Sequence, residues 1–258
     1  MIMATSQSTS SSSSSSYPSS LFANPNLTTQ LLFLWLLLSG LSPVAPQKVT
    51  VSLYYETLCP YCATFIVDSL SKLFRDNLIS IVNLRLIPWG NGIVQSDGSM
   101  VCQHGPDECL LNAIEACTIS IFPDTVRQFN FVYCVEWLML RGRHGEWSRC
   151  LQSTGLGNAP IDCYNRGYGN QLERRNADET AGLNPRHRFV PWVIVDNHPL
   201  QEDFPNFVSY ICKAYRGNQQ PAACRALSAG DFRYSDIKVD HSVCYTSGNA
   251  PNVTSTLQ

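Results

Sequence analysis

The chain has 258 residues, of which 44% are hydrophobic and 15% are charged, and its formal net charge is −2 at pH 7. A body of about 210 residues after the N-terminal leader is long enough to bury a full core as one domain, with or without a large insertion. The near-neutral charge gives no reason to expect nucleic acid or an anionic membrane as a partner.

The first 47 residues contain no charged side chain and no histidine. A serine-rich start leads into the apolar stretch 31–38, which suits the hydrophobic region of a signal peptide and is shorter than the ~20 residues needed to span a bilayer. We interpret residues 1–47 as a leader with a signal peptide. A signal anchor and an organelle transit peptide are the alternatives, because the segment before the apolar stretch is long and lacks positive charge.

Eleven cysteines lie after the leader. So many thiols are typical of an exported protein and unusual in a reducing cytosol. The sequence Asn252-Val253-Thr254 is a candidate glycosylation site at Asn252 and agrees with a lumenal route. We expect the secretory pathway, with a lysosome, a vacuole or the extracellular space as the destination, and no stable membrane association after signal removal.

The first elements of the body form a recognisable order. Residues 49–55 are rich in β-branched and aromatic side chains and predict a buried strand. Cys59-Pro60-Tyr61-Cys62 follows, then apolar residues at helical spacing over 63–78, then a second predicted strand over 81–87. Strand, Cys-x-x-Cys, helix and strand indicate the opening of a thioredoxin-like fold, in which the two strands are parallel and joined by a right-handed crossover.

The middle of the chain has a helical pattern. After a predicted loop at 90–98, helices are expected at 108–121, 124–141, 146–152 and 161–181. Six cysteines fall in this part, and their pairing does not follow from the sequence. We interpret residues from about 100 to 185 as a disulfide-rich helical insertion between the two halves of the fold.

The strand signal returns at 189–196, followed by a turn at 197–199 and a closing helix at 204–215. The predicted fold is therefore an α/β thioredoxin-like domain over 48–228, with the insertion between its βαβ half and its second half. Residues 229–258 are expected to form a loosely ordered tail.

The Cys-x-x-Cys places Cys59 at the N-terminus of the predicted helix. There the helix dipole and unpaired N–H groups favour the thiolate, so the pKa of Cys59 should lie below the ~8.5 of a free thiol. Cys62, one turn further in, is expected to be more buried and less acidic. We assign Cys59 as the nucleophile that attacks a substrate disulfide and Cys62 as the resolving cysteine.

Other interpretations of the Cys-x-x-Cys are a structural disulfide and half of a zinc site. No second Cys-x-x-Cys exists in the sequence, so we predict no metal. The alternatives for the whole protein are a disulfide oxidase or isomerase on the same scaffold, and a secreted disulfide-rich binding or chaperone module.

Pro191 stands where thioredoxin-like proteins carry a cis-proline that faces the active sulfurs. We expect a cis Val190–Pro191 bond, with the backbone of Val190 available to pair with an extended substrate peptide. A trans-proline at a strand edge is the alternative.

One stretch resembles a known family. The run from Cys102 to Cys117 matches every specified position of the signature Cys-Gln-His-Gly-x-x-Glu-Cys-x-x-Asn-x-x-x-x-Cys of the gamma-interferon-inducible lysosomal thiol reductase (GILT) family. The matching residues are Cys102, Gln103, His104, Gly105, Glu108, Cys109, Asn112 and Cys117. The resemblance also takes in the Cys-x-x-Cys, Val190-Pro191-Trp192 and the pair Cys212 and Cys224.

The resemblance implies reduction of protein disulfides at acidic pH, with Cys59 and Cys62 as the active pair. Such a reductase needs no cofactor beyond its dithiol and takes electrons from an external small thiol. Pro60-Tyr61 is the dipeptide familiar from glutaredoxins, so redox potential and substrate preference stay open.

Five further residues complete the sequence predictions. Cys212 and Cys224 close a short loop and are expected to form a structural disulfide that stabilises by roughly 3 kcal/mol. His104 is interpreted as structural, with a proton shuttle near Cys59 as the alternative. Glu56 is interpreted as a surface acid, with tuning of the thiol as the alternative, and the odd Cys244 is expected to be free, paired between chains, or removed with the tail.

Overall fold

The computed structural model describes residues 29–30, 47–228 and 242–247. The remaining leader, the sequon at Asn252 and most of the predicted tail lie outside the described residues. The chain divides into a unit of residues 1–45, of which Thr29 and Gln30 are described and are helical, and a unit of residues 46–258. No helix among the described residues combines the length and the apolar character of a membrane span.

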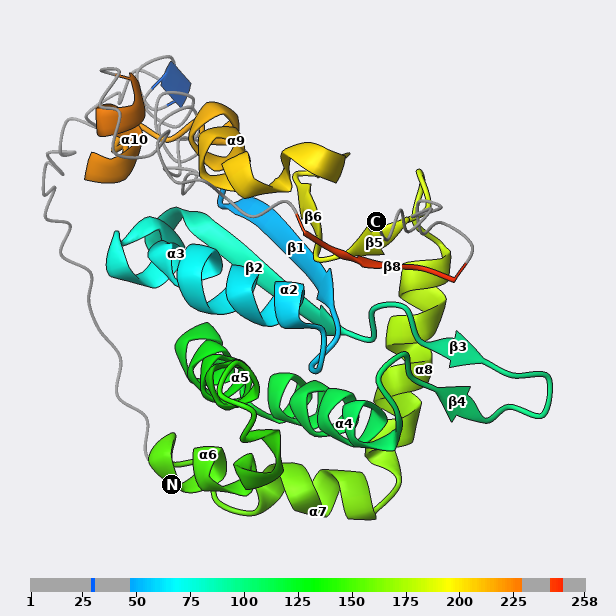
Figure 1. Ribbon diagram of the computed structural model, residues 1–258. Coiled ribbons are helices and arrows are strands. Elements are labelled where there is room, and N and C mark those ends of the chain that lie inside the picture. The colour runs from blue at the N-terminus through cyan, green and yellow to red at the C-terminus, as the bar shows by residue number, and fades with distance from the viewer. Residues whose placement is uncertain (1–28, 31–46, 229–241, 248–258) are drawn as a thin grey trace, which may run out of the picture. The chain divides into compact units, whose positions relative to one another are not determined.

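A four-stranded sheet lies at the centre of the second unit, in the order β2-β1-β6-β7 (Figure 1). β1 (Val49–Tyr55) and β2 (Val82–Pro88) are parallel, as the sequence predicts. β6 (Trp192–Val195) runs antiparallel to β1, and β7 (His198–Pro199) runs antiparallel to β6. The buried side of β1 joins the main hydrophobic core.

The crossover between β1 and β2 is helical but not one uniform helix. α2 (Pro60–Thr64) continues into a π-helical turn, η1 (Phe65–Leu70), and then α3 (Lys72–Arg75), before the 3₁₀ turn η2 (Leu78–Ile81). The helix begins at Pro60, directly after Cys59, because proline suits the first helical position, where no N–H is needed.

The insertion is helical, as predicted, and its elements are α4 (Pro106–Ile121), α5 (Thr125–Met139), η3 (His144–Glu146), α6 (Ser148–Ser153), α7 (Ala159–Asn165) and α8 (Tyr168–Ala181). The single helix predicted over 161–181 is wrong, because Gly167 takes a left-handed φ of 80° and separates α7 from α8. The predicted loop at 90–98 instead holds part of a short hairpin of β3 (Ile93–Val94) and β4 (Met100–Val101).

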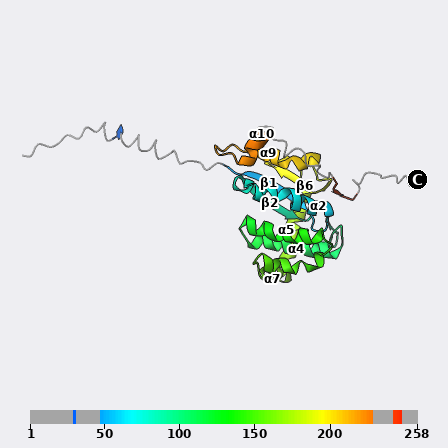
Figure 2. The same ribbon diagram turned by 60° about the vertical axis from the view of Figure 1, so that its left-hand side comes forward.

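Three disulfides link the six cysteines of the insertion. They join Cys102 to Cys109, Cys117 to Cys163 and Cys134 to Cys150. Figure 2 shows α4, α5 and α7 together on one side of β1 and β2, with α9 and α10 on the other side. The insertion has a second hydrophobic cluster of its own, built around residues such as Leu111, Phe131 and Val135.

The second half of the fold begins with β5 (Phe189–Val190). The strand predicted over 189–196 is divided at Pro191, where the Val190–Pro191 bond is cis, into β5 and β6. After β7 come the 3₁₀ turn η4 (Gln201–Asn206), α9 (Phe207–Ala214) and α10 (Ala222–Ser228). A disulfide joins Cys212 on α9 to Cys224 on α10.

Part of the predicted tail packs on the domain. β8 (Cys244–Tyr245) pairs antiparallel with β5, and Cys244 belongs to the main hydrophobic core. The prediction of a loosely ordered tail is therefore wrong for residues 242–247. A parallel βαβ unit, an antiparallel β6–β7 hairpin after a cis-proline, and a helical insertion between them make this a thioredoxin-like α/β domain.

Candidate active site

Cys59 caps the N-terminus of α2. Its backbone is extended, and its sulfur accepts a hydrogen bond from the main-chain N–H of Cys62 at 3.4 Å. Pro60 occupies the first turn, where its missing N–H leaves no hydrogen bond unmade. Such an environment stabilises negative charge on a cysteine sulfur.

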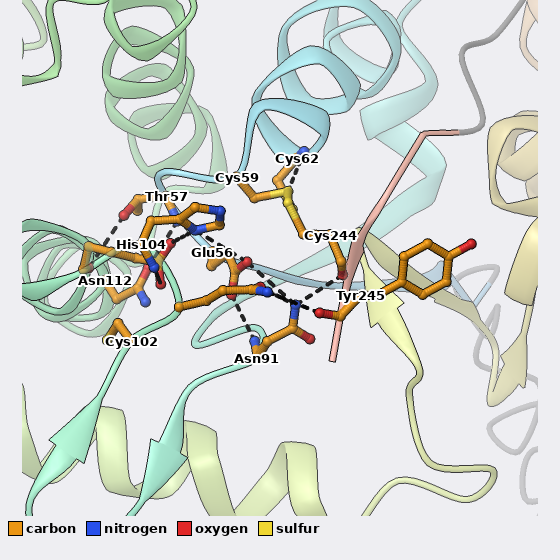
Figure 3. A network of polar contacts seen from close by, with 12 residues as sticks. Glu56, Thr57, Cys59, Cys62, Asn91, Cys102, His104, Asn112, Cys244 and Tyr245 are labelled. Carbon is orange, nitrogen blue, oxygen red and sulfur yellow. Dashed lines mark hydrogen bonds and ion pairs between the residues drawn. A yellow bond between two sulfur atoms is a disulfide. The ribbon is translucent and has the colours of Figure 1, made fainter. Parts of the chain in front are cut away.

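Cys59 is bonded to Cys244 in this structure, and not to Cys62 (Figure 3). Cys62 is buried and is the one cysteine outside a disulfide among the residues that the structure describes. The expectation that Cys244 is free, paired between chains or removed is therefore wrong, because β8 carries its sulfur to the N-terminus of α2. Nothing in the local sequence around Cys244 indicates this partner, which lies 185 residues away.

Cys62 lies in an environment that favours its thiol form. Burial is the largest cause that raises the pKa of Cys62 above its ordinary value, and the negative charge of nearby Glu56 adds to it. A main-chain hydrogen bond from Glu56 stabilises the thiolate and acts in the opposite direction. Cys62 therefore keeps its proton until a base or a reaction partner removes it.

Glu56 is fully buried, so its interpretation as a surface acid is wrong. The main-chain N–H of Asn91 donates to Oε2 of Glu56 at 2.8 Å. Gly90 permits this approach, because a Cβ there would lie 2.5 Å from Oε2 of Glu56 and its φ is +58°. Burial and then the charge of Glu108 raise the pKa of Glu56 to about 8, against the lowering effect of Asn91.

His104 connects the signature segment to this carboxyl group. Its Nδ1 lies 2.5 Å from Oε2 of Glu108 and 3.6 Å from Oε1 of Glu56. The hydrogen bond to Glu108 is the largest cause that raises the pKa of His104. His104 holds the buried Glu108 in place, as the structural interpretation expects, and its ring also lies beside Glu56.

The other signature residues build the support of the Cys59 loop. Cys102 and Cys109 form a disulfide across the start of α4, and Gly105 lies at the N-cap of that helix. Oδ1 of the buried Asn112 accepts a hydrogen bond from the main-chain N–H of Thr57 at 3.1 Å. The signature helix therefore holds the residues that immediately precede Cys59.

Two more buried acids lie further inside and were missed by the sequence reasoning. Oε2 of Glu115 accepts a hydrogen bond from the hydroxyl of Tyr55 at 2.6 Å, and burial raises the pKa of Glu115 to about 8. Burial also raises the pKa of Glu136, and neither of its carboxyl oxygens has a hydrogen-bond partner among the described residues. A spacing of seven residues puts Glu115 on the same helix face as Glu108, which is the signal that could have found it.

Val190 precedes the cis-proline Pro191 and pairs with the residue that is bonded to Cys59. Val190 is opposite Cys244 in the β5–β8 pairing, so its backbone is engaged by an extended segment of the chain itself. The sequence assigned Val190 to pair with a substrate; the structure places residues 244–245 there.

A cluster with possible metal ligands lies at the same place. One side-chain atom each of Glu56, His104 and Cys244 lies within 4.8 Å of the other two. In this state the sulfur of Cys244 is part of a disulfide, so it is not available as a thiolate ligand.

Comparisons with known proteins identify the family. Residues 50–154 match the model of the family described as gamma interferon inducible lysosomal thiol reductase (GILT). A gamma-interferon-responsive lysosomal thiol protein of Arabidopsis thaliana is 39% identical over 186 residues, which cover 70% of this chain and 78% of the relative. A gamma-interferon-inducible lysosomal thiol reductase of Mus musculus is 33% identical over 198 residues, covering 74% and 78%.

Among solved structures, BdbD from Bacillus subtilis matches with a TM-score of 0.49 and 16% identity, covering 67% of this chain and 89% of that chain. The two relatives above are each more than 30% identical to this chain and align with more than two thirds of it. The chain therefore belongs to the gamma interferon inducible lysosomal thiol reductase (GILT) family, and is a thiol–disulfide oxidoreductase with a thioredoxin-like fold.

Proposed function

We propose that the protein reduces disulfide bonds of exported or endocytosed proteins through Cys59 and Cys62, in an acidic compartment. The position of Cys59 carries this proposal. Its sulfur accepts the N–H of Cys62 at the start of α2, where a leaving or attacking thiolate is stabilised.

The reaction proceeds by two exchanges. The thiolate of Cys59 attacks one sulfur of a substrate disulfide, and the other substrate sulfur leaves as a thiolate that takes up a proton. The sulfur of Cys62 then attacks the sulfur of Cys59, which breaks the mixed disulfide and forms the Cys59–Cys62 bond. Two small-thiol molecules restore the dithiol and are oxidised to one disulfide.

Glu56 is the group best placed to take the proton of Cys62. Both residues are fully buried, and the charge of Glu56 acts on Cys62 directly. Transfer of the proton to ionised Glu56 produces the Cys62 thiolate for the second exchange; because the pKa of Glu56 is raised to about 8, only a small fraction of Glu56 serves in this way at acidic pH. His104 is in reach of Glu56 and is half-exposed, so it offers a path for the proton to solvent.

The buried carboxyl groups support an acidic compartment. The pKa values of Glu56, Glu115 and Glu173 are each raised to about 8, so these groups are neutral in the folded protein at acidic pH. A neutral carboxyl is far less costly to bury than a carboxylate. The eleven cysteines, ten of them in disulfides, agree with a lysosomal, vacuolar or extracellular location.

Reduction of insulin disulfides tests the proposal. The protein, supplied with a small thiol, should accelerate insulin reduction at about pH 4.5 more than the same thiol alone does, and Cys59→Ser should abolish the acceleration. Equal rates for the protein and Cys59→Ser would rule out the proposed reductase. An enzyme that instead introduces disulfides into reduced insulin under these conditions would be an oxidase.

Thiol reactivity supplies the second test. In the variant Cys62→Ser/Cys244→Ser, the thiolate absorbance of Cys59 should titrate well below the ~8.5 of a free thiol. A value near that of a free cysteine would contradict reduction at acidic pH, because too little thiolate would be present.

A further inference from the structure

Residues 242–247, named here the 242–247 segment, lie against the site in an extended conformation. Cys244 is bonded to Cys59, and its exposed fraction is 8%, while Cys59 itself is completely buried. In this state the sulfur of Cys59 cannot be reached by another protein. The segment therefore occupies the position from which a substrate sulfur would meet Cys59.

Main-chain pairing holds the segment in place. β8 runs antiparallel to β5, with Cys244 opposite Val190 and Tyr245 opposite Phe189. The N–H of Thr246 continues the ladder and donates to the carbonyl oxygen of Arg188 at 3.0 Å. An added strand of this kind gains affinity from main-chain N–H and C=O groups, which every peptide has.

Two side-chain amides also bind the backbone of the segment (Figure 3). Nδ2 of Asn91 donates to the carbonyl oxygen of Cys244 at 2.9 Å, and Nε2 of Gln103 donates to the carbonyl oxygen of Tyr245 at 3.0 Å. Nδ2 of Asn91 also donates to Oε1 of Gln103 at 2.7 Å, which fixes the two amides relative to each other. These contacts do not depend on the side chains of the bound segment.

Side-chain contacts of the segment are fewer. The ring of Tyr245 packs edge-on against Phe189 at 6.1 Å and is 37% exposed. Thr246 lies at the rim of an open cleft of about 910 Å³ that Arg174, Arg186 and Arg188 also line. The site therefore accepts an extended chain of several residues and places an aromatic contact next to the cysteine.

We propose that the 242–247 segment is a tethered pseudosubstrate, and that β5, Asn91 and Gln103 form the groove that binds the main chain of disulfide-containing substrates. This inference rests on the proposed reductase function. The substrate class is an extended, unfolded polypeptide segment with a half-cystine, preferentially followed by an aromatic residue. Gln103 and Asn91 act as positioning residues, because they contact the peptide backbone beside the reacting sulfur.

The Cys59–Cys244 disulfide opens by the same chemistry as a mixed disulfide with a substrate. The sulfur of Cys62 attacks the sulfur of Cys59, the Cys59–Cys62 bond forms as the Cys59–Cys244 bond breaks, and Cys244 leaves as a thiolate that takes up a proton. No net oxidation occurs in this step. The small thiol of the proposed function then supplies two electrons and reduces the Cys59–Cys62 bond. After both steps Cys59 is a free thiol and is no longer bonded to the 242–247 segment.

Disulfide mapping of the full chain tests the resting state. Protein isolated from an oxidising compartment and quenched with acid should yield the peptide of Cys59 bonded to the peptide of Cys244, with Cys62 open to alkylation after unfolding. A Cys59–Cys62 bond with an alkylated Cys244 would overturn the proposal.

Trapping separates the pseudosubstrate from the proposed function. As isolated, Cys62→Ser should retain the Cys59–Cys244 bond and capture insulin in mixed disulfides at least tenfold more slowly than Cys62→Ser/Cys244→Ser. Cys62→Ser/Ser247→Ala is the matched control, because Ser247 is exposed in the same segment, and should behave like Cys62→Ser. Equal capture by the single and double variants would refute the pseudosubstrate while leaving the reductase function intact.

A failure of the proposed function gives a different result. A small activated disulfide should label Cys59 in Cys62→Ser/Cys244→Ser whether or not the protein binds peptides. If this reagent labels Cys59 but the double variant captures no insulin at all, the reductase function fails, and the pseudosubstrate proposal fails with it.

The groove is tested with the peptide Ser-Val-Cys-Tyr-Thr-Ser, whose cysteine carries an activated disulfide. In the Cys62→Ser/Cys244→Ser background, Gln103→Ala should slow capture of this peptide about fivefold, as expected for one lost hydrogen bond. Gln95→Ala, also at an exposed glutamine, is the control and should not slow it. Equal rates for the two variants, with equal labelling by the small reagent, would remove Gln103 from the groove.

Discussion

The side-chain oxygen of Asn112 accepts a hydrogen bond from the main-chain N–H of Thr57 at 3.1 Å, and both residues are fully buried. The bond connects α4 of the insertion to the loop that leads into Cys59. The helical insertion is therefore part of the catalytic framework, because it fixes the backbone from which the reactive cysteine projects.

Asn112→Ala should lower the free energy of unfolding by about 1–3 kcal/mol, because the N–H of Thr57 would be left buried without its acceptor. Urea unfolding of the two proteins measures the change. Asn170→Ala, at an exposed position of α8, is the control and should have little effect. An equally small effect at both positions would show that the Thr57 N–H finds another partner.

Folding stability should increase as the pH falls from about 8 towards about 4.5. The folded-state pKa values of Glu56, Glu115 and Glu173 are raised to about 8, above their unfolded values. The folded state therefore binds more protons in this window, so the stabilisation is complete below the unfolded pKa and is lost as the pH rises through about 8. His187 opposes this trend, because burial lowers its pKa and its contribution is lost as the pH falls.

Thermal unfolding at several pH values checks this prediction. Each raised carboxyl contributes a slope of up to about 1.4 kcal/mol per pH unit between its unfolded and folded pKa values. The melting temperature should be higher at about pH 5 than at about pH 8. The opposite order would mean that these carboxyl groups ionise in the folded protein.

Glu173→Gln should weaken the pH dependence of stability, because the folded state would bind about one proton fewer relative to the unfolded state. Glu173 is buried on α8, its Oε1 has no hydrogen-bond partner among the described residues, and burial is the cause of its raised pKa. A neutral amide has no ionisation to lose. Glu146→Gln is the control, because Glu146 is only partly buried and its hydrogen bond and ion pair with Arg143 lower its pKa instead.

Glu56→Gln should lower the pKa of Cys62, because the negative charge of Glu56 is one cause of its increase. The pKa of Cys62 should stay above its ordinary value, since burial is the larger cause. The rate of Cys62 alkylation against pH measures this in a Cys59→Ser/Cys244→Ser background, where Cys62 is the sole thiol outside the structural disulfides. An unchanged profile would show that Glu56 does not act on Cys62.

The insertion disulfides should differ in their effect on stability. Cys117 and Cys163 are 46 residues apart, whereas Cys102 and Cys109 are 7 apart. Loop-closure entropy predicts a loss of about 4 kcal/mol when the longer link is replaced by two serines and about 2 kcal/mol for the shorter one. Urea unfolding of the two double variants compares them, and an equal loss would indicate that local strain or residual structure outweighs loop length.

The sequence by itself determined the local features of this protein. The strand before Cys59, the helix that begins at Pro60, the proline at 191 and the signature over 102–117 each depend on residues close together in the chain. Hydrophobic periodicity and the restricted backbone of proline encode such features directly. For the same reason, the parallel β1–β2 pair and the helical insertion were predictable.

Only the tertiary structure decided which distant residues meet. The burial of Glu56 depends on Gly90 and Asn91, which approach it from the loop after β2. The three insertion disulfides required the packing of α4 to α8, since cysteine spacing alone permits many pairings. Cys244 reaches Cys59 because β8 adds to β5, and main-chain hydrogen bonds of that kind leave no pattern in the side chains of the sequence.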